Sequence, residues 1–310
     1  MTDLKIRKIP FRFDDTTPFQ WNPENPEFGL VANAIGMLVI SMEKMIVSVV
    51  RKVMPRIHDP DAAAEAQAFL RQEALHSRAH QQHLQSLLGR YPGLAETIQE
   101  VDSSFRRIEE DNTLEFCVAY IAALEATFPP LFKMILDNHE ALLAPGDARV
   151  ASLFAWHFVE EIEHRSSALV VYDAVVGDPF YRLRVVVPAF THAAGLFATL
   201  IEGFERHVPL EDRLVEAYPL LPSRSWSREI TARLPLVGSR FRGRYPTAFG
   251  AVPGAELAIT VARLLRSQLP YHKPADEPLP RWAETWFDAY ERGVDMTTFE
   301  GAIPVTPPRP

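Results

Sequence analysis

Long apolar stretches at helical spacing fill the middle of the chain, and prolines gather towards its two ends. Residues 1–29 contain four prolines, residues 208–310 contain fourteen, and residues 30–207 contain eight. Proline breaks a helix because it lacks a backbone N–H and clashes with the preceding turn. The pattern therefore predicts long helices in the middle of the chain and irregular segments at both ends. No alternation typical of strands stands out between residues 30 and 207.

Five long helices and two shorter amphipathic ones account for the apolar spacing. The ranges expected for them are 29–54, 59–88, 112–138, 148–176, 179–206, 254–269 and 281–293. Pro55 and Gly89 end the first two, and Asp59-Pro60 is typical of a helix start. Pro129-Pro130 is expected to kink the third helix.

These helices predict an all-α fold organised as one domain. An irregular arm over 1–28 precedes a four-helix bundle over 29–207, and a proline-rich helical extension over 208–310 packs on that bundle. The uncharged run at 185–201 is short for a membrane span and contains Pro188 and His192. We therefore expect it to be a buried helix of the core, with membrane association as the less favoured alternative.

Composition and charge narrow the class of protein. Hydrophobic residues make up 47% of the 310 residues and charged residues 23%, a balance typical of soluble globular proteins. A net charge of −8 with no Lys/Arg block argues against nucleic acid as a partner. Cys117 is the single cysteine, which excludes an intrachain disulfide and a cysteine metal cluster and suggests a small buried residue. The N-terminus lacks the apolar region of a secretory signal, so a cytoplasmic location is expected.

Two glutamates lie in strongly apolar helical segments. Glu43 lies in MLVISMEKMIVSVV, and Glu125 lies in AYIAALEATF. Taken singly, each is as consistent with a solvated or paired side chain as with a functional one. Their meaning depends on the motifs that follow them.

A Glu-x-x-His motif follows each lone glutamate, one helix later. The motifs are Glu73-Ala-Leu-His76 and Glu161-Ile-Glu-His164, whose first residues come 30 and 36 residues after the preceding lone glutamate. Residues i and i+3 share a helix face, so each motif directs a carboxylate and an imidazole at one point. One such motif is weak support for a site, but the repeated arrangement is specific.

The six side chains have the composition of a two-metal centre. Two divalent ions bring a charge of +4, which four glutamates neutralise, and the histidines raise selectivity for iron or manganese over calcium. Four-helix di-iron and di-manganese proteins use this arrangement. We therefore predict two iron ions, with manganese or a mixed pair as alternatives, on a centre a few ångströms across. The predicted ligands, whose four glutamates are also the predicted catalytic residues, are Glu43, Glu73, His76, Glu125, Glu161 and His164.

Two further histidines lie one helical turn from these ligands. His157 precedes Glu161 by one turn, and we include it as a seventh ligand. His80 follows His76 by one turn, and we interpret it as a polar residue at the edge of the site. For both, the alternatives of metal ligand and outer hydrogen-bond partner stay open.

Other residues close to the predicted ligands have two interpretations each. Gln72 and Glu160 could accept the outer N–H groups of metal-bound imidazoles, or they could be solvated surface residues. Tyr120, Trp156 and Tyr172 lie within one or two turns of the ligands and could carry radicals. Aromatic residues in such positions are more often part of the core.

The motifs resemble those of known families. The general pattern resembles the ferritin-like di-iron carboxylate proteins, which implies a ferritin-like bundle. More closely, residues 5–295 resemble a bacterial family labelled "predicted metal-dependent hydrolase", through IRKIPFRF, the Glu43 helix, QEALHSRAH and EEIEH. The His157, Glu161 and His164 triplet is similar to that of the di-iron arylamine N-oxygenases, where a third histidine joins four glutamates and two histidines. That similarity covers the ligand set only and implies oxygen activation.

Three functions are compatible with this pattern. The first is a di-iron oxygenase or oxidase acting on a small hydrophobic substrate, with O2 and an electron donor as partners. The second is a hydrolase in which a bimetallic centre generates hydroxide, although hydrolytic sites more often use aspartates. The third is a ferritin-like protein that handles metal without catalysis. The long apolar helices are also compatible with a homodimer.

Overall fold

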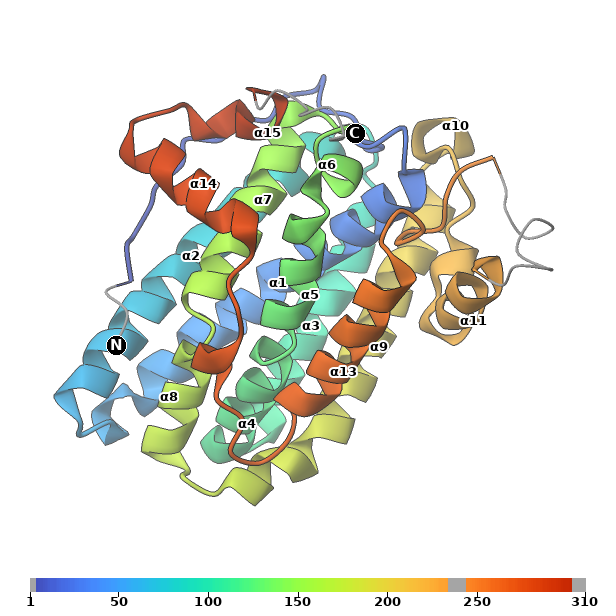
Figure 1. The fold of residues 1–310 in the computed structure, drawn as a ribbon. Coiled ribbons are helices and arrows are strands. Elements are labelled where there is room, and N and C mark those ends of the chain that lie inside the picture. Colours follow the sequence, from blue (N-terminus) through green and yellow to red (C-terminus); the bar gives the residue numbers. More distant parts are fainter. Residues whose placement is uncertain (1–3, 234–243, 303–310) are drawn as a thin grey trace.

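The chain folds into a bundle of helices, as a computed structural model describes for residues 4–233 and 244–302 (Figure 1). Those residues contain no strand, which confirms the expected all-α bundle with additional C-terminal helices. The helices are α1 Pro26–Val53, η1 Met54–Arg56, α2 Pro60–Leu88, α3 Leu94–Asp111, α4 Leu114–Glu125, α5 Phe128–Asp137, α6 His139–Leu142, α7 Ala148–Glu163, α8 Ser167–Val175, α9 Pro179–His207, α10 Leu210–Arg213, η2 Tyr218–Leu220, α11 Pro222–Ala232, α13 Gly254–Ser267, η3 Pro274–Asp276, α14 Arg281–Glu291, η4 Met296–Thr298 and α15 Phe299–Ala302.

The first two helices form the hairpin on which the rest of the bundle packs. The Asn25 side chain caps α1 by accepting from the backbone N–H of Phe28, and Asp59 caps α2 by accepting from Ala62. Each helix also has a proline in its first turn, where the missing N–H costs nothing. These local signals explain why both helices begin and end close to the expected residues.

Two expected helices are each divided into two. The expected third helix is interrupted completely between α4 and α5, whereas we predicted only a kink. The reason is that Pro129 and Pro130 offer no N–H to the carbonyl groups of Glu125 and Ala126 four residues earlier. The expected fourth helix ends at Glu163 and resumes as α8. Both breaks fall beside predicted metal ligands.

The break after α7 is stabilised by a side chain. Arg165 donates from Nη1 to the carbonyl of Ile162 at 2.8 Å and from Nε to the carbonyl of Pro274 at 3.1 Å. A basic side chain commonly satisfies the last carbonyl groups of a helix in this way. Arg165 therefore ends α7 and ties it to the C-terminal segment.

One long helix was missed by the sequence prediction. Helix α3 has 18 residues and few apolar ones. Its buried positions are Leu94, Thr97, Val101 and Phe105, which repeat at helical spacing and form one face. The prediction was wrong here because the many charged residues on the opposite face concealed this narrow stripe.

Helix α9 is not the buried core helix that we expected. Val185, Ala189 and Leu196 face the core, whereas Val187 is 71% exposed and Leu183 is 43% exposed. The uncharged run therefore has an exposed side, and the prediction of a buried core helix was wrong.

Three helical stretches are long and apolar enough to span a membrane, at Pro26–Arg56, Leu114–Asp137 and Pro179–His207. The most apolar window is 72% buried in each of the first two and 28% buried in the third. The cytoplasmic location consequently stays a prediction from the sequence.

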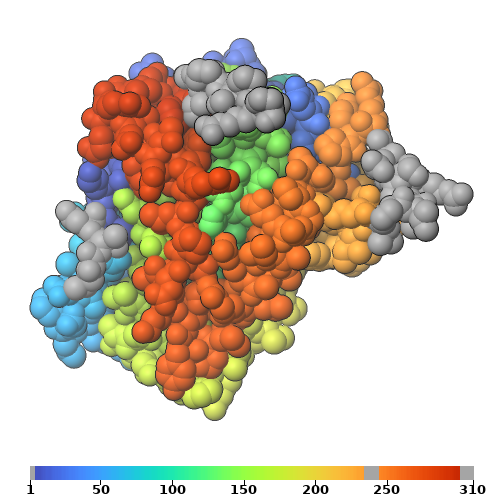
Figure 2. Space-filling model, viewed as in Figure 1, coloured from blue at the N-terminus to red at the C-terminus, as the bar shows by residue number. Residues whose placement is uncertain are grey.

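The C-terminal third lies on the bundle. Helix α13 packs against α5, and α15 packs against α7. Figure 2 shows the orange and red segments after residue 243 covering much of the face seen in this view. The N-terminal arm reaches the C-terminal end of α7, where Arg7 bonds Glu160, and also α14, where the Arg7 guanidinium lies 4.9 Å from the Phe287 ring centre.

Candidate metal centre

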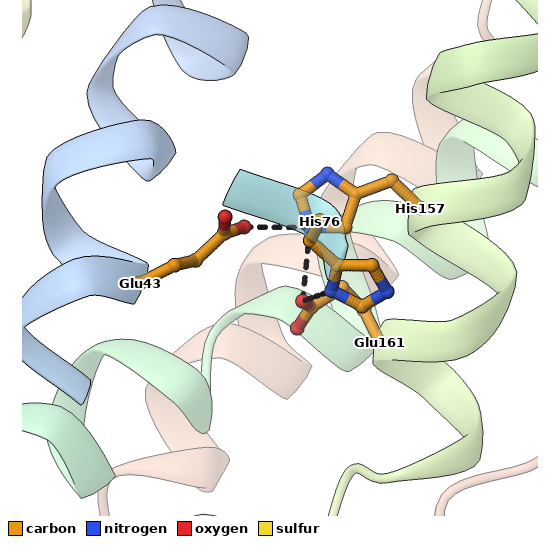
Figure 3. A group of neighbouring side chains, drawn as sticks. All are labelled: Glu43, His76, His157 and Glu161. Atoms are coloured by element: carbon orange, nitrogen blue, oxygen red, sulfur yellow. Dashed lines mark hydrogen bonds and ion pairs between the residues drawn. The ribbon is translucent and has the colours of Figure 1, made fainter. Parts of the chain in front are cut away.

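The structure brings all seven predicted metal-ligating side chains together in the interior. They form two groups in which one ligand atom of each residue lies within 4.8 Å of the others. The first group is Glu43, His76, His157 and Glu161 (Figure 3), and the second group is Glu73, Glu125, Glu161 and His164. All seven are between 0% and 5% exposed. Glu161 belongs to both groups and so joins them.

The first group takes its side chains from three helices, α1, α2 and α7 (Figure 3). His157 Nε2 lies 2.9 Å from Glu161 Oε1 and 3.2 Å from Glu43 Oε1. His76 Nδ1 lies 3.5 Å from the same Oε1 of Glu161. Oε1 of Glu161 therefore lies close to both imidazoles of the first group.

The second group is centred on His164, the residue at which α7 ends. Its Nε2 lies 3.1 Å from Glu161 Oε2, 3.2 Å from Glu73 Oε1 and 3.9 Å from Glu125 Oε2. Glu125 is the last residue of α4, so the break in the chain after it also borders the site. The two oxygens of Glu161 thus face different groups.

One detail of the sequence prediction was wrong. We expected Glu73 and His76 to point at one place, but Glu73 lies in the second group and His76 in the first. Residues three apart on a helix differ in height by about 4.5 Å, because each residue rises about 1.5 Å. Glu73 and His76 therefore contribute to two adjacent metal groups, one residue to each.

Many polar atoms of the centre have no hydrogen-bond partner although they are buried. They include both carboxylate oxygens of Glu43 and Glu73, Oε1 of Glu125, Oε2 of Glu161, Nδ1 of His76 and Nε2 of His164. An unpaired buried polar atom is costly, and an unpaired buried carboxylate more so. Atoms of this kind converging on two points indicate sites for cations.

The pKa values also show that, in the protein without metal, these buried carboxyl groups are unfavourable in their charged form. Burial raises the pKa of Glu43, and burial together with neighbouring carboxylates raises those of Glu73 and Glu125 well above the usual value. For Glu161 burial acts in the same direction, but His164 and the hydrogen-bonding histidines outweigh it and hold its pKa well below normal. Burial would lower the pKa of His76, yet hydrogen bonds with Glu160 and Glu161 raise it to about 10.

The donor atoms fit metal ions in spacing as well as in type. Two ligands that bind one ion at about 2.1 Å and at a right angle lie about 3.0 Å apart. The separations of His157 from Glu161 and Glu43, and of His164 from Glu161 and Glu73, are 2.9 to 3.2 Å. Carboxylates and imidazoles together suit iron, manganese or zinc more than calcium. The residues present therefore fit two ions that share Glu161.

Each ligand histidine has a partner for its outer ring nitrogen. His76 Nε2 lies 2.9 Å from Glu160 Oε2, and His164 Nδ1 lies 3.1 Å from Gln72 Oε1. These contacts agree with the outer-acceptor interpretation of Glu160 and Gln72, which are both 0% exposed and not surface residues. Such partners fix the ring orientation and tautomer of metal-bound histidines.

His80 lies behind His157 and in neither metal group. Its Nε2 is 2.8 Å from His157 Nδ1. Burial and the neighbouring histidines hold the pKa of His80 well below its usual value, so the ring is neutral. A neutral His80 can accept the N–H of His157, which leaves Nε2 of His157 free to face the centre.

Aromatic rings surround the histidines and keep the centre dry. Trp156 lies 4.9 Å from the His76 ring, Phe69 lies 5.0 Å from His164, and Phe132 lies 6.1 Å from His157, between ring centres. The two tyrosines considered as radical carriers bond elsewhere: Tyr120 to His192 at 2.7 Å, and Tyr172 to the carbonyl of Asp178.

Sequence reasoning missed Arg7. Its guanidinium is 3% exposed and donates to Glu160 at 3.1 Å and to Glu163 at 2.7 and 2.8 Å. No helical spacing could link residue 7 to α7, because the contact spans about half of the chain. The only signal was its place in IRKIPFRF, a segment that carried the family resemblance.

Comparison with known proteins gives one result that bears on function. A family model described as "predicted metal-dependent hydrolase" matches residues 5–234, which contain every residue of both groups. No curated protein and no solved structure matches the chain.

Proposed function

Because the chain belongs to the family described as predicted metal-dependent hydrolase, we propose that it is an enzyme with two metal ions, one in each donor group. The membership supports a metal-dependent enzyme. The two buried groups that share Glu161 support a pair of ions. Four glutamates neutralise two divalent ions and so make the buried centre electrically balanced.

We further propose that the ions are iron and that the reaction is an O2-dependent oxidation. The observation that carries this proposal is the donor set itself: four carboxylates and three imidazoles within a fully buried core. A pair of ferrous ions would supply two electrons to O2, with the remaining electrons coming from the organic substrate or an electron donor, and mixed carboxylate and imidazole ligation suits iron. The ferritin-like di-iron proteins, which the ligand pattern resembles, use a similar set.

The residues of the chain have distinct tasks in this proposal. Glu161 holds the two positions together, since each of its oxygens faces one group. Burial of the ligands and the surrounding rings of Trp156 and Phe132 exclude water. A dry apolar surrounding admits O2, a small apolar molecule, more readily than it admits a charged substrate.

An apolar cavity supports a hydrophobic substrate. It measures about 180 Å³ and borders helix α5. On that helix Leu131 and Met134 line the cavity, while Phe132 points instead at the ring of His157. Phe197 and Leu264 are among the other apolar lining residues. One helix therefore separates an apolar binding space from the first metal group.

Hydrolysis is the second candidate, and the family description favours it over oxidation. A two-metal centre can generate hydroxide and polarise a carbonyl or phosphoryl group. Such a reaction also needs a proton donor beside the ions. Glu160, a carboxylate close to the centre, is already engaged with His76 and Arg7. A buried centre of this kind would also have to open to admit water and a polar substrate.

Metal loading followed by two assays separates these candidates. Metal-free protein is loaded with ferrous iron under argon and then mixed with O2, and the zinc-loaded protein is tested on nitrophenyl esters and phosphates. We expect two irons per chain and iron oxidation that is fast compared with free iron, both lost in Glu161→Ala and retained in Glu205→Ala. Glu205 is a matched control because it pairs with Arg213, outside both groups.

The other outcomes have definite meanings. Hydrolysis by the zinc form that Glu161→Ala abolishes, without iron oxidation, would replace the oxygenase with the hydrolase. Loading far above two irons per chain would instead favour a ferritin-like metal-handling protein. Failure to bind any metal would refute the two-metal centre itself.

A further inference from the structure

We propose that Arg7 is a positioning residue that holds one imidazole of each metal group, His76 in the first and His164 in the second. The inference rests on the proposed two-metal centre. It assigns to the N-terminal arm and to helix α14 a role in metal binding, through a chain of hydrogen bonds from His76 to His164 that passes through Arg7.

The first half of the chain controls His76. Glu160 Oε2 lies 2.9 Å from His76 Nε2, and Arg7 Nη1 donates to Glu160 Oε1 at 3.1 Å. Glu160 is 0% exposed, and its two oxygens contact these two side chains. An ionised carboxylate only accepts, so Nε2 of His76 must carry the proton. In the neutral ring that binds a metal, the lone pair of His76 then lies on Nδ1, the atom that faces Glu161.

The second half controls His164 through Gln72. Both carboxylate oxygens of Glu163 accept from Arg7, at 2.7 and 2.8 Å. The Gln72 amide nitrogen donates to Glu163 at 3.0 Å and to the carbonyl of Lys5 at 3.0 Å. Since both amide hydrogens are used, the Gln72 oxygen is turned towards Nδ1 of His164. Nδ1 therefore donates to the amide oxygen, and Nε2 is the His164 atom that faces the second group.

Arg7 itself is held in place by a separate part of the chain. Its guanidinium carbon lies 5.9, 4.9 and 5.5 Å from the ring centres of Trp286, Phe287 and Tyr290, all on α14. A guanidinium over aromatic rings is attracted by their negative faces. Burial acts to lower the pKa of Arg7, but Glu163 and Glu160 raise it above its ordinary value, so the charge is retained.

The guanidinium is suited to this task because it is planar and carries several donors. One group bonds two different carboxylates at once, which the single ammonium of lysine does with poorer geometry. Loss of Arg7 would free Glu160 and Glu163 to repel each other and to rotate. His76 and His164 would lose their fixed orientation, and metal affinity would fall although every ligand is still present.

Metal titration of four proteins tests the proposal. Cobalt(II) is titrated into metal-free wild type, Arg7→Gln, Arg7→Lys and Arg213→Gln, and the dissociation constants and visible spectra are recorded. Arg213 is the matched control because it is also buried and pairs bidentately with a glutamate, Glu205. Circular dichroism of each metal-free protein checks that the helices form.

We expect Arg7→Gln to weaken metal binding about 10- to 100-fold, the usual cost of losing an outer partner of metal ligands, and to change the cobalt spectrum. Arg7→Lys should recover part of the affinity, and Arg213→Gln should bind as wild type does. Wild-type affinity and spectrum in Arg7→Gln would overturn the proposal. Equal weakening in Arg213→Gln would also overturn it, because the effect would then be one of general stability.

A second variant covers the case in which Arg7→Gln does not fold. Glu163→Gln keeps the shape of the side chain and removes the charge that Arg7 and Gln72 contact, and it should weaken cobalt binding in the same way. Unchanged binding there would count against the chain of contacts. Wild type that binds no cobalt would refute the two-metal centre and not the role of Arg7 alone.

Discussion

Two clusters of charged side chains in this protein, one partly buried and one fully buried, differ in how their polar atoms are satisfied. In the pair formed by Arg213 and Glu205, the guanidinium donates to both carboxylate oxygens at 2.6 and 2.7 Å and to the carbonyls of Val208 and Val215. The backbone N–H of Ala217 also donates to Glu205. In the metal centre, by contrast, both oxygens of Glu43 and of Glu73 lack partners.

The difference separates a structural cluster from a functional one. A buried charge that is fully paired needs nothing from outside the chain. Carboxylates that face one another without hydrogen-bond partners are balanced only when they take up protons or a cation. The unsatisfied cluster is therefore where an external cation is needed, and the following predictions test that contrast.

The largest expected effect is on metal stoichiometry. Glu161→Ala should abolish binding of both ions, because Glu161 is the one residue that both groups share. Glu125→Ala should reduce two ions to one, because Glu125 belongs to the second group only. Elemental analysis of the purified variants gives both numbers. Two ions retained in Glu161→Ala would contradict the shared position.

The next effect is on stability at the paired cluster. Glu205→Ala leaves the buried Arg213 without its carboxylate and should lower the free energy of unfolding by about 3 kcal/mol. Metal content should stay at the wild-type value. Chemical denaturation and elemental analysis of the same preparation check both statements, and a loss of metal would show that the two clusters are not independent.

A smaller effect is the pH dependence of the metal-free protein. Glu73 and Glu125 have pKa values raised by burial, so the folded state holds more protons than the unfolded chain once the pH exceeds about 4.3. Their destabilising effect is absent below that pH and grows as the pH rises. His76 acts in the same direction, because its stabilising contribution is complete below about 6.5 and is lost as the pH rises towards its folded pKa of about 10.

His80 and His83 have lowered pKa values and oppose this trend up to about pH 6.5, so the metal-free protein should lose stability between about pH 7 and pH 9. The metal-loaded protein should show the opposite trend, because ions bind the deprotonated ligands. Thermal unfolding of both forms across this range measures the difference. Parallel pH profiles for the two forms would mean that the carboxylates do not titrate with metal binding.

The smallest effect is expected at His80. His80→Asn removes the ring that holds Nδ1 of His157 and should weaken metal binding about tenfold without changing the stoichiometry. His83→Asn is the matched control, since His83 is also buried on α2 but contacts no ligand residue through its ring. Cobalt titration compares the two variants, and equal metal affinities would show that His80 has no role in metal binding.

The sequence predicted the parts of the centre that local spacing determines. Glu73 with His76 and Glu161 with His164 follow from the helical repeat, and caps such as Asp59 placed the helix ends. The division of Glu73 and His76 between two groups was not predictable, because it depends on the height at which α2 passes α7. Arg7 was missed because its role arises from tertiary contacts alone.

The same limit explains the errors in the fold. The charged face of α3 concealed a stripe that only packing reveals, as at Val101 and Phe105. The apolar run in α9 resembles a core helix in composition, yet Val187 lies on a side that no described segment covers. The composition of a helix is known from the sequence, whereas its burial depends on which other helices pack against it.

Anomalous diffraction at the iron edge, on crystals of iron-loaded protein, tests the central claim most directly. The account predicts two peaks about 3.5 to 4 Å apart, one beside each donor group and with Glu161 between them. A single peak, no peak, or iron bound away from Glu161 would contradict it.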